Sequence, residues 1–195
     1  MRVKEGNKDQ AIMNAAISVF AHHGFHKAKI HKVAELANVA IGSIYLYYKS
    51  KEDILVKIYD NVWKRLYAEA SLIHKRTDAN SSEKLDALFS AYFNTFETNP
   101  ELAKVFVNEQ DYLSERGKNS TTYYSMFFEV SEQIIKEGIK GGEIRSDVNV
   151  AALRVFILGG VRSVLREWAF NPGVASIQQY RETISSTIKR GIIIS

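Results

Sequence analysis

The chain has 195 residues, and 46% of them are hydrophobic, so it can bury a core without covalent staples. It contains no cysteine and no apolar run of about 18 residues, which excludes disulfides, thiolate metal sites and a membrane-spanning helix, and a cytoplasmic protein is expected. The net charge is +4, and eight basic but three acidic residues precede Glu52, so the positive charge gathers in the N-terminal quarter.

Helical spacing of apolar residues recurs along the chain, whereas the alternation typical of strands is hard to find. This pattern predicts an all-α protein of about nine helices. A first helix ends at Gly24, whose freedom to adopt a positive φ suits a helix C-terminus. A second follows over 30–37 and ends at Asn38, which tolerates a left-handed turn. A third short helix spans about 41–48.

The fourth predicted helix is long and has a clear start. Ser50 is expected to cap it, with Asp53 at the third helical position returning the hydrogen bond to the cap residue. Its apolar face continues until Lys75 and Arg76, where a polar loop over 77–82 begins. Three further helices are predicted over 83–98, 100–115 and 120–140.

The C-terminal part contains two more predicted helices. Gly141 and Gly142 stop the preceding helix, and Asp147 is expected to cap the next one, which ends at the 171–173 break. A final helix follows to the end of the chain. The apolar stripes of these last two helices are expected to face a second copy of the chain, with Gly159 and Gly160 allowing close approach.

Two short helices joined by a tight turn and followed by a capped long helix describe a helix-turn-helix. In such motifs the second helix presents its N-terminal side chains to the major groove. On the predicted third helix, Ile44 and Tyr48 share an inner face, which turns Ile41, Tyr45 and Tyr47 outward. Lysines flank this helix and could neutralise phosphates. The residues alone leave a second interpretation open, in which the tyrosines simply pack in a small three-helix core.

The stretch from Lys32 to Leu55, KVAELANVAIGSIYLYYKSKEDIL, resembles the signature of the TetR family of bacterial transcription repressors. Asn38, Ser43 and Tyr48 stand where that family usually has glycine, threonine and phenylalanine. The resemblance implies that Ile41 and Gly42 approach base edges while nearby side chains grip phosphates. Together with the charges it predicts DNA contacts at Lys29, His31, Lys32, Ala40, Ile41, Gly42, Ser43, Tyr45, Tyr47, Lys49 and Lys51. It also predicts a DNA-binding domain over 1–52 and an effector-binding and dimerisation domain over 53–195.

Aromatic and sulfur-containing side chains crowd the predicted middle helices. Most belong to the core, but a cavity lined by aromatics and a few polar groups would suit a lipophilic effector, as the family implies. The predicted ligand contacts are Phe89, Tyr92, Phe93, Phe96, Phe106, Gln110, Tyr123, Met126, Phe127, Arg162 and Trp168. The stretch 134–148 is similar to the fatty-acid-degradation regulator branch, which implies a long-chain acyl-CoA effector. Arg154, Arg162 and Arg166 could meet its phosphates or form a solvated stripe.

The residues also bear on other classes of function. Five histidines show no paired metal-ligand spacing, and neither a glycine-rich phosphate loop nor a nucleophile elbow is found, so no enzyme, metal or cofactor is expected. A DNA-packaging protein would lack a ligand pocket. A regulator of a multidrug efflux pump would instead sense lipophilic cations, for which Glu97, Glu109 or Asp111 could provide buried carboxylates. The sequence therefore favours a homodimeric repressor that binds operator DNA and is released by a lipophilic effector.

Overall fold

The computed structural model describes residues 8–115 and 122–194, apart from the side chains of 110–115. The described residues form nine α-helices and one isolated β-bridge, which confirms the predicted all-α fold. The helices are α1 (Lys8–His23), α2 (Ile30–Leu36), α3 (Ile41–Tyr47), α4 (Lys51–His74), α5 (Ser81–Glu97), α6 (Pro100–Glu115), α7 (Thr122–Lys140), α8 (Val150–Phe170) and α9 (Ile177–Ile192). Within these ranges, no helix is both long and apolar enough to span a bilayer.

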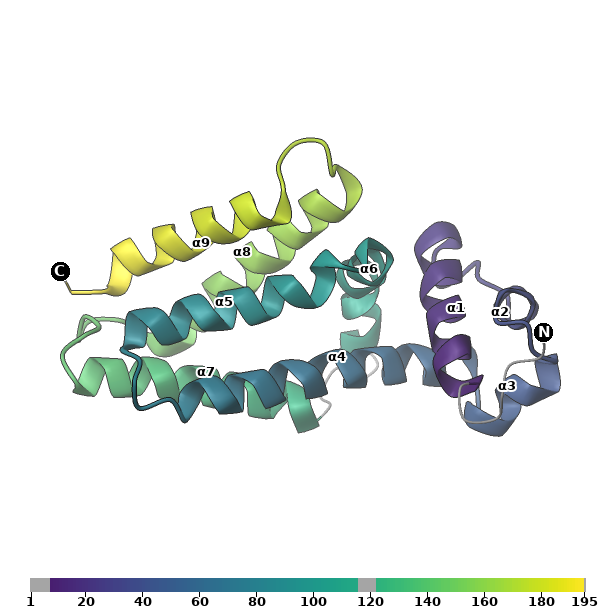
Figure 1. The fold of residues 1–195 in the computed structure, drawn as a ribbon, viewed down its shortest axis with the longest axis horizontal. Coiled ribbons are helices and arrows are strands. Elements are labelled where there is room, and N and C mark those ends of the chain that lie inside the picture. Colours follow the sequence, from purple (N-terminus) through teal and green to yellow (C-terminus); the bar gives the residue numbers. More distant parts are fainter. Residues whose placement is uncertain (1–7, 116–121, 195) are drawn as a thin grey trace.

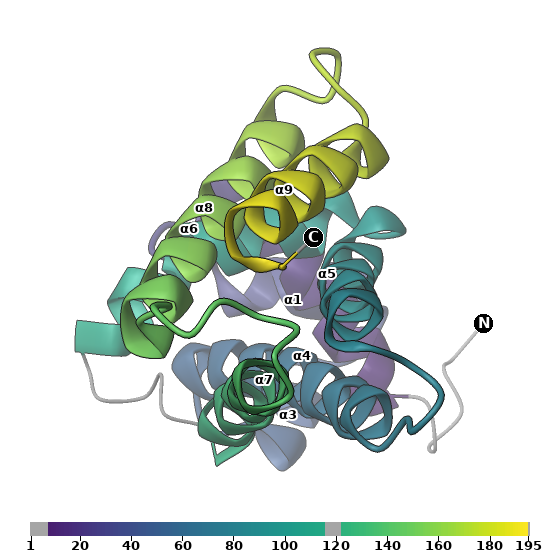
Figure 2. The ribbon, with the colours of Figure 1, turned by 90° about the vertical axis from the view of Figure 1, so that its left-hand side faces the viewer.

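The helices form a small and a large group joined by α4 (Figure 1). Helices α1, α2 and α3 cluster at one end, and α4 runs from this cluster along much of the larger group. There α4 packs against α7 and α5, while α9 packs on α5 and α8 on α6. Figure 2 looks along the bundle and shows α8 and α9 as one side of it, with α4 and α7 on the other. Helix α6 contacts both α1 and α8, so it is a second connection between the two groups.

The predicted helix ends are set by local chemistry. Gly24, Asn38 and Gly142 have φ values of 73°, 53° and 76°, the left-handed conformation that ends a helix. Ser50 caps α4 by accepting a hydrogen bond from the Asp53 N–H at 3.2 Å, as predicted. The expected return bond was wrong, because the Asp53 carboxylate accepts from the Lys49 N–H at 2.9 Å instead.

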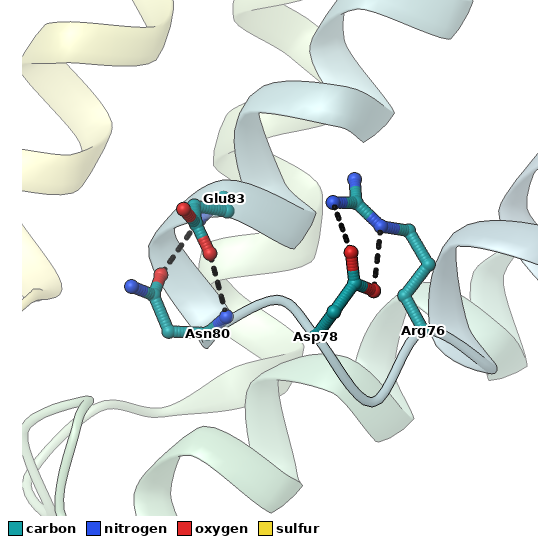
Figure 3. A network of polar contacts seen from close by, with 4 residues as sticks. All are labelled: Arg76, Asp78, Asn80 and Glu83. Atoms are coloured by element: carbon teal, nitrogen blue, oxygen red, sulfur yellow. Dashed lines mark hydrogen bonds and ion pairs between the residues drawn. The ribbon is translucent and has the colours of Figure 1, made fainter.

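Two other predicted boundaries are corrected. Helix α5 begins two residues earlier than predicted, because Asn80 and Glu83 form a reciprocal cap in which each side chain accepts from the other's N–H (Figure 3). Helix α8 is capped by Asn149 rather than Asp147, whose carboxylate pairs with Arg145 at 2.6 Å. The predicted start of α7 at residue 120 lies outside the described residues.

A continuous hydrophobic core runs through both groups of helices, and α4 supplies side chains along its whole length. Leu55, Ile58 and Leu66 of α4 are almost fully buried. Trp63 lies between α6 and α7, where its ring contacts Phe106 at 5.6 Å and Tyr124 at 4.9 Å between centroids. The position of α4 is therefore determined by packing against both groups.

The stretch 134–148, which carried the resemblance to fatty-acid-degradation regulators, is a packed structural junction. Gly138 of α7 is buried, and a Cβ there would lie 2.5 Å from Ser81 Oγ and 2.7 Å from Ile144 Cδ1. The Ser81 side chain, and then its backbone N–H, lower the pKa of Glu143. The Glu143 carboxylate accepts from that N–H at 2.6 Å, which satisfies the start of α5. Ile144 is buried and pairs as a β-bridge with Ile193, a contact that the sequence analysis missed.

The lack of space at Gly138 predicts that Gly138→Ala lowers stability by about 1–2 kcal/mol, because overpacking outweighs the gain in helix propensity. Thermal unfolding should show a Tm lower by roughly 2–6 °C. Gly191→Ala is the matched control, since a Cβ there meets nothing within 4 Å. Equal Tm values for the two variants would contradict the close packing.

Candidate DNA-binding surface and ligand cavity

Helix α3 has one buried and one exposed face. Ile44 and Tyr48 are buried against the neighbouring helices, whereas Ile41, Tyr45 and Tyr47 are 48%, 56% and 41% exposed. The interpretation in which all three tyrosines fill a core is therefore wrong, since only Tyr48 does so. Leu46 is even more exposed, at 84%, and was not among the predicted contacts. Such a concentration of exposed apolar side chains on one short helix is typical of a contact surface.

The remaining predicted DNA-contact residues lie in or beside α2 and α3. Ala40 and Gly42 are exposed, and a Cβ at Gly42 would meet nothing within 4 Å. The protein interior therefore does not require glycine at 42, whereas close approach of another molecule would. Ser43 is half-buried. The exposed basic side chains are Lys29, His31, Lys32 and Lys49, of which Lys32 pairs with Glu35 at 2.9 Å.

Lys51 differs from the other predicted phosphate contacts. Its Nζ donates to the backbone oxygens of Phe25, His26 and Ala28 at 2.7, 3.1 and 3.2 Å. It also lies 4.6 Å from the centroid of the Phe25 ring. An ammonium group has three N–H donors, so these three carbonyls account for all of them. No pattern in the sequence indicates these contacts, because the acceptors are backbone atoms more than 20 residues away.

Tyr48, the departure from the usual phenylalanine, binds within the protein. Its hydroxyl donates to Asp9 Oδ1 of α1 at 2.5 Å. Burial, and then this hydrogen bond, raises the pKa of Tyr48 well above its ordinary value. The bond connects the end of α3 to the start of α1, and thereby helps to hold α3 in place.

A cavity lies between α4, α5, α7 and α8 and contains about 670 Å³ of space not filled by atoms, its open mouth included. Three of the predicted ligand residues, Phe89, Tyr92 and Phe127, line it. The sequence did not indicate Trp63, which α4 contributes to the lining, or most of the lining residues of α8. The lining is Trp63, Leu85, Leu88, Phe89, Tyr92, Phe127, Phe128, Ser131, Glu132, Ile135, Arg154, Ile157, Leu158 and Val161.

The other predicted ligand residues do not line this cavity. Phe93, Phe96 and Phe106 are almost fully buried in the core, and Trp168 is buried as well. Tyr123 and Met126 are half-buried elsewhere on α7, and Tyr123 contacts the Tyr67 ring at 6.0 Å. The side chain of Gln110 lies outside the described residues. Helical spacing identified three of the four helices, α5, α7 and α8, but not which of their faces meet at the hollow.

The charged groups near the cavity are paired. Arg154 contacts Glu132 at 3.3 Å, and Lys136 contacts the same carboxylate at 3.0 Å. Arg162 donates to the Val107 oxygen and Arg166 to Asn108 Oδ1, both on α6. The three arginines therefore join α8 to its neighbours, although Arg154 and Arg166 are also exposed to solvent.

The carboxylates considered for cationic drugs lie elsewhere. Glu97 is exposed, Glu109 is buried, and neither lines the cavity. The side chain of Asp111 lies outside the described residues.

The apolar stripes predicted to face a second copy are mostly used inside the chain. Val161, Leu165 and Trp168 of α8 are buried within the protomer, as are Ile177 and Ile188 of α9. That part of the prediction is wrong, because these stripes cover the chain's own core.

A different face of α8 is exposed. It carries Val155 and Phe156, which are 64% and 68% exposed, followed by Gly159 and Gly160, where an added Cβ would meet nothing within 4 Å.

Comparison with known proteins places this arrangement in a family. The family model for bacterial regulatory proteins of the tetR family matches residues 12–58, and the model for the tetracyclin repressor-like C-terminal domain matches 78–192. The chain belongs to the TetR family. It is a DNA-binding transcriptional regulator of the ligand-responsive TetR type, with the predicted helix-turn-helix at its N-terminus.

Among its relatives are regulators of fatty-acid metabolism. The chain is 31% identical over 166 residues to the fatty acid metabolism regulator protein of Bacillus subtilis, covering 84% of each chain. It also resembles the structure of the fatty acid degradation regulator FadR from Bacillus halodurans, with a TM-score of 0.83 and 26% identity over 95% of this chain and 96% of that one. The structure of Bacillus subtilis FadR in complex with stearoyl-CoA matches with a TM-score of 0.81 and 28% identity over 92% of this chain and 96% of that one. These findings confirm the predicted resemblance to that branch, and the relatives are regulators rather than enzymes.

The Tyr48 hydroxyl predicts a specific sensitivity to alkaline pH. Because the folded state raises the pKa of this phenol, its contribution to stability is complete below the unfolded pKa, about 10, and is lost as the pH rises above that value. Tyr48→Phe should be less stable than the parent at pH 7 by about 1 kcal/mol, the contribution of one hydrogen bond. In urea unfolding, the gap between the two proteins should narrow from pH 9 to 11. Equal stabilities at pH 7 would show that the hydroxyl does not contribute, and a gap that stays constant up to pH 11 would contradict the raised pKa of Tyr48.

Proposed function

We propose that this TetR-family regulator is a homodimeric repressor that leaves its operator when a long-chain acyl-CoA enters the cavity between α4, α5, α7 and α8. The observation that carries the proposal is an apolar hollow whose two charged lining residues, Glu132 and Arg154, lie together. The stearoyl-CoA complex of the related FadR supports the same class of ligand.

The character of the cavity supports a fatty chain. Apart from Ser131, Glu132 and Arg154, and the phenol of Tyr92, its lining is hydrocarbon or aromatic. The Ser131 hydroxyl already donates to the Phe127 oxygen at 2.8 Å. Each methylene of an acyl chain that is buried against this lining contributes about 0.8 kcal/mol.

The charge around Glu132 in the lining favours an anionic head group over a lipophilic cation. Glu132 is matched there by two cations, Arg154 and Lys136, so an approaching phosphate meets a positive excess. A cationic drug would need an unpaired carboxylate in the lining, and Glu132 is already neutralised. This arrangement supports the acyl-CoA alternative over the efflux-pump alternative.

We assign operator contacts to the exposed face of α3 and its flanks. Ile41, with the open backbone at Gly42, suits apolar contact with thymine methyl groups. Such a contact distinguishes few of the hydrogen-bond donors and acceptors on the base edges. Ala40 lies beside them. Ser43, Tyr45 and Tyr47 donate to phosphates, and Lys29, His31, Lys32 and Lys49 add positive charge around the groove.

Helix α4 provides a path from the cavity to this surface. Trp63 lines the cavity, and twelve residues earlier the same helix begins directly after α3, about 18 Å away along its axis. A ligand that displaces Trp63 therefore moves the base of the helix-turn-helix. Release follows only if the ligand binds the displaced state more tightly than the DNA-bound one.

Two copies are needed to read successive major grooves, about 34 Å apart. We assign the dimer contact to the exposed face of α8 with Val155, Phe156, Gly159 and Gly160, together with α9. Exposed Phe156 and Val155 would be covered there, and the two glycines would let the helices approach closely.

Filling the cavity tests the effector assignment. Leu158→Trp should leave operator affinity within about twofold. It should raise the stearoyl-CoA concentration needed for release by about tenfold or more, because the indole fills space that the acyl chain needs. Fluorescence anisotropy of a labelled operator, selected from random duplexes, gives both values. Leu72→Trp is the control, since Leu72 is exposed on α4 and lies outside the cavity. Release by tetraphenylphosphonium but not by stearoyl-CoA would instead support the efflux-pump alternative.

A charge on the α8 face tests the dimer. Phe156→Glu should give monomers in sedimentation analysis at micromolar concentration, because two carboxylates would be buried against apolar side chains. Gln133→Glu, an exposed change on α7, should leave the dimer unchanged. A Phe156→Glu protein that remains dimeric would place the interface elsewhere.

A further inference from the structure

We infer that Lys51 is a positioning residue that closes the helix-turn-helix on itself, and not one of the residues that grip operator phosphates. The inference rests on the proposed operator contacts and concerns how the α2–α3 pair is held. It reverses the role that the family resemblance implies for this side chain.

Lys51 and its acceptors lie on opposite sides of the α2–α3 segment in the chain. Lys51 is the first residue of α4, four residues after the end of α3. Phe25, His26 and Ala28 lie in the connection between α1 and α2, just before α2 begins at Ile30. Nζ bonds to all three carbonyls at 2.7–3.2 Å, so the two ends of the segment that contains α2 and α3 are joined by one side chain.

The surroundings of the ammonium group strengthen this contact. The Phe25 ring beneath it is 1% exposed and packs edge-on against Phe20 of α1, with centroids 5.3 Å apart. Three carbonyl oxygens converge on one point, and the cation offsets their mutual repulsion. Side-chain bonds to a charged group are roughly twice as strong as neutral ones.

A phosphate contact would compete with this arrangement. To reach DNA, the Lys51 ammonium would have to leave the Phe25, His26 and Ala28 oxygens, and the carbonyls would lose their donor. Lys49 does not face that conflict. Its side chain is exposed and makes no hydrogen bond or ion pair with the part of the chain that the structure describes, so it is free to meet a phosphate.

The salt dependence of operator binding separates the two roles. A lysine that neutralises a phosphate releases counterions. Its removal therefore makes the negative slope of log K against log salt shallower by about 0.9. We expect Lys51→Met to weaken binding about tenfold with an unchanged slope, because the charged hydrogen bonds position α2 and α3 without touching DNA. The matched variant Lys49→Met should make the slope shallower by about 0.9.

Arginine substitutions give a second readout. Arginine binds phosphate at least as well as lysine, so Lys49→Arg should keep the parent affinity. Lys51→Arg should not, because a planar guanidinium does not match three carbonyls that converge on a compact ammonium. Amide hydrogen exchange adds a local measure: residues 28–32 should lose protection in Lys51→Met but not in Lys49→Met.

The experiment uses the full chain and the duplex selected by the parent protein, well below the Tm of every variant. A salt slope that is shallower by about 0.9 in Lys51→Met, with full affinity in Lys51→Arg and unchanged amide hydrogen exchange, would overturn the inference and restore the phosphate contact. If the parent protein itself bound no duplex, the proposed function would fail instead. If Lys51→Met proved unfolded by circular dichroism, the comparison of Lys51→Arg with Lys49→Arg would decide.

Discussion

The structure depends on the burial of α4 along its whole length. This helix packs against α1 at its start and against α5 and α7 further along, so it belongs to both the small and the large group of helices. Leu55 and Leu66, which lie three turns apart, are both fully buried. Because a close-packed interior does not deform gradually, a change of shape around Trp63 must move the helix as a body. The same packing that stabilises the fold therefore connects the cavity to the DNA-binding surface.

Exposed apolar side chains gather in two places that suit two different partners. On α3, Ile41 and Tyr45 are exposed beside lysines, a combination that suits a polyanion with apolar base edges. On α8, Phe156 and Val155 are exposed beside glycines, which suits a second helix at close distance. Exposure of these groups costs hydration free energy unless a partner covers them. The fold thus presents the two proposed contact surfaces on separate helices, of which α8 lines the cavity itself and α3 is joined to it through α4.

Hydrogen bonds made by charged side chains join elements of the fold in addition to the apolar core. Lys51 holds the connection before α2, Arg162 and Arg166 join α8 to α6, and Glu101 of α6 accepts from the Ser18 hydroxyl of α1 at 3.3 Å. Each of these contacts joins residues far apart in the chain. They give α6 a connection to the DNA-binding helices that is independent of α4, so the two groups of helices are joined at two points.

The sequence by itself determined the helices, their ends at Gly24 and Asn38, and the inward position of Ile44, because these depend on periodicity and on the chemistry of a few adjacent residues. The exposed face of α3 followed from the same spacing. Only the tertiary structure decided which aromatics line the cavity, which face of α8 stays exposed, and what Lys51 binds. Helical spacing defines a face but not the neighbour that covers it, and a lysine's partners can be backbone oxygens that leave no mark in the sequence.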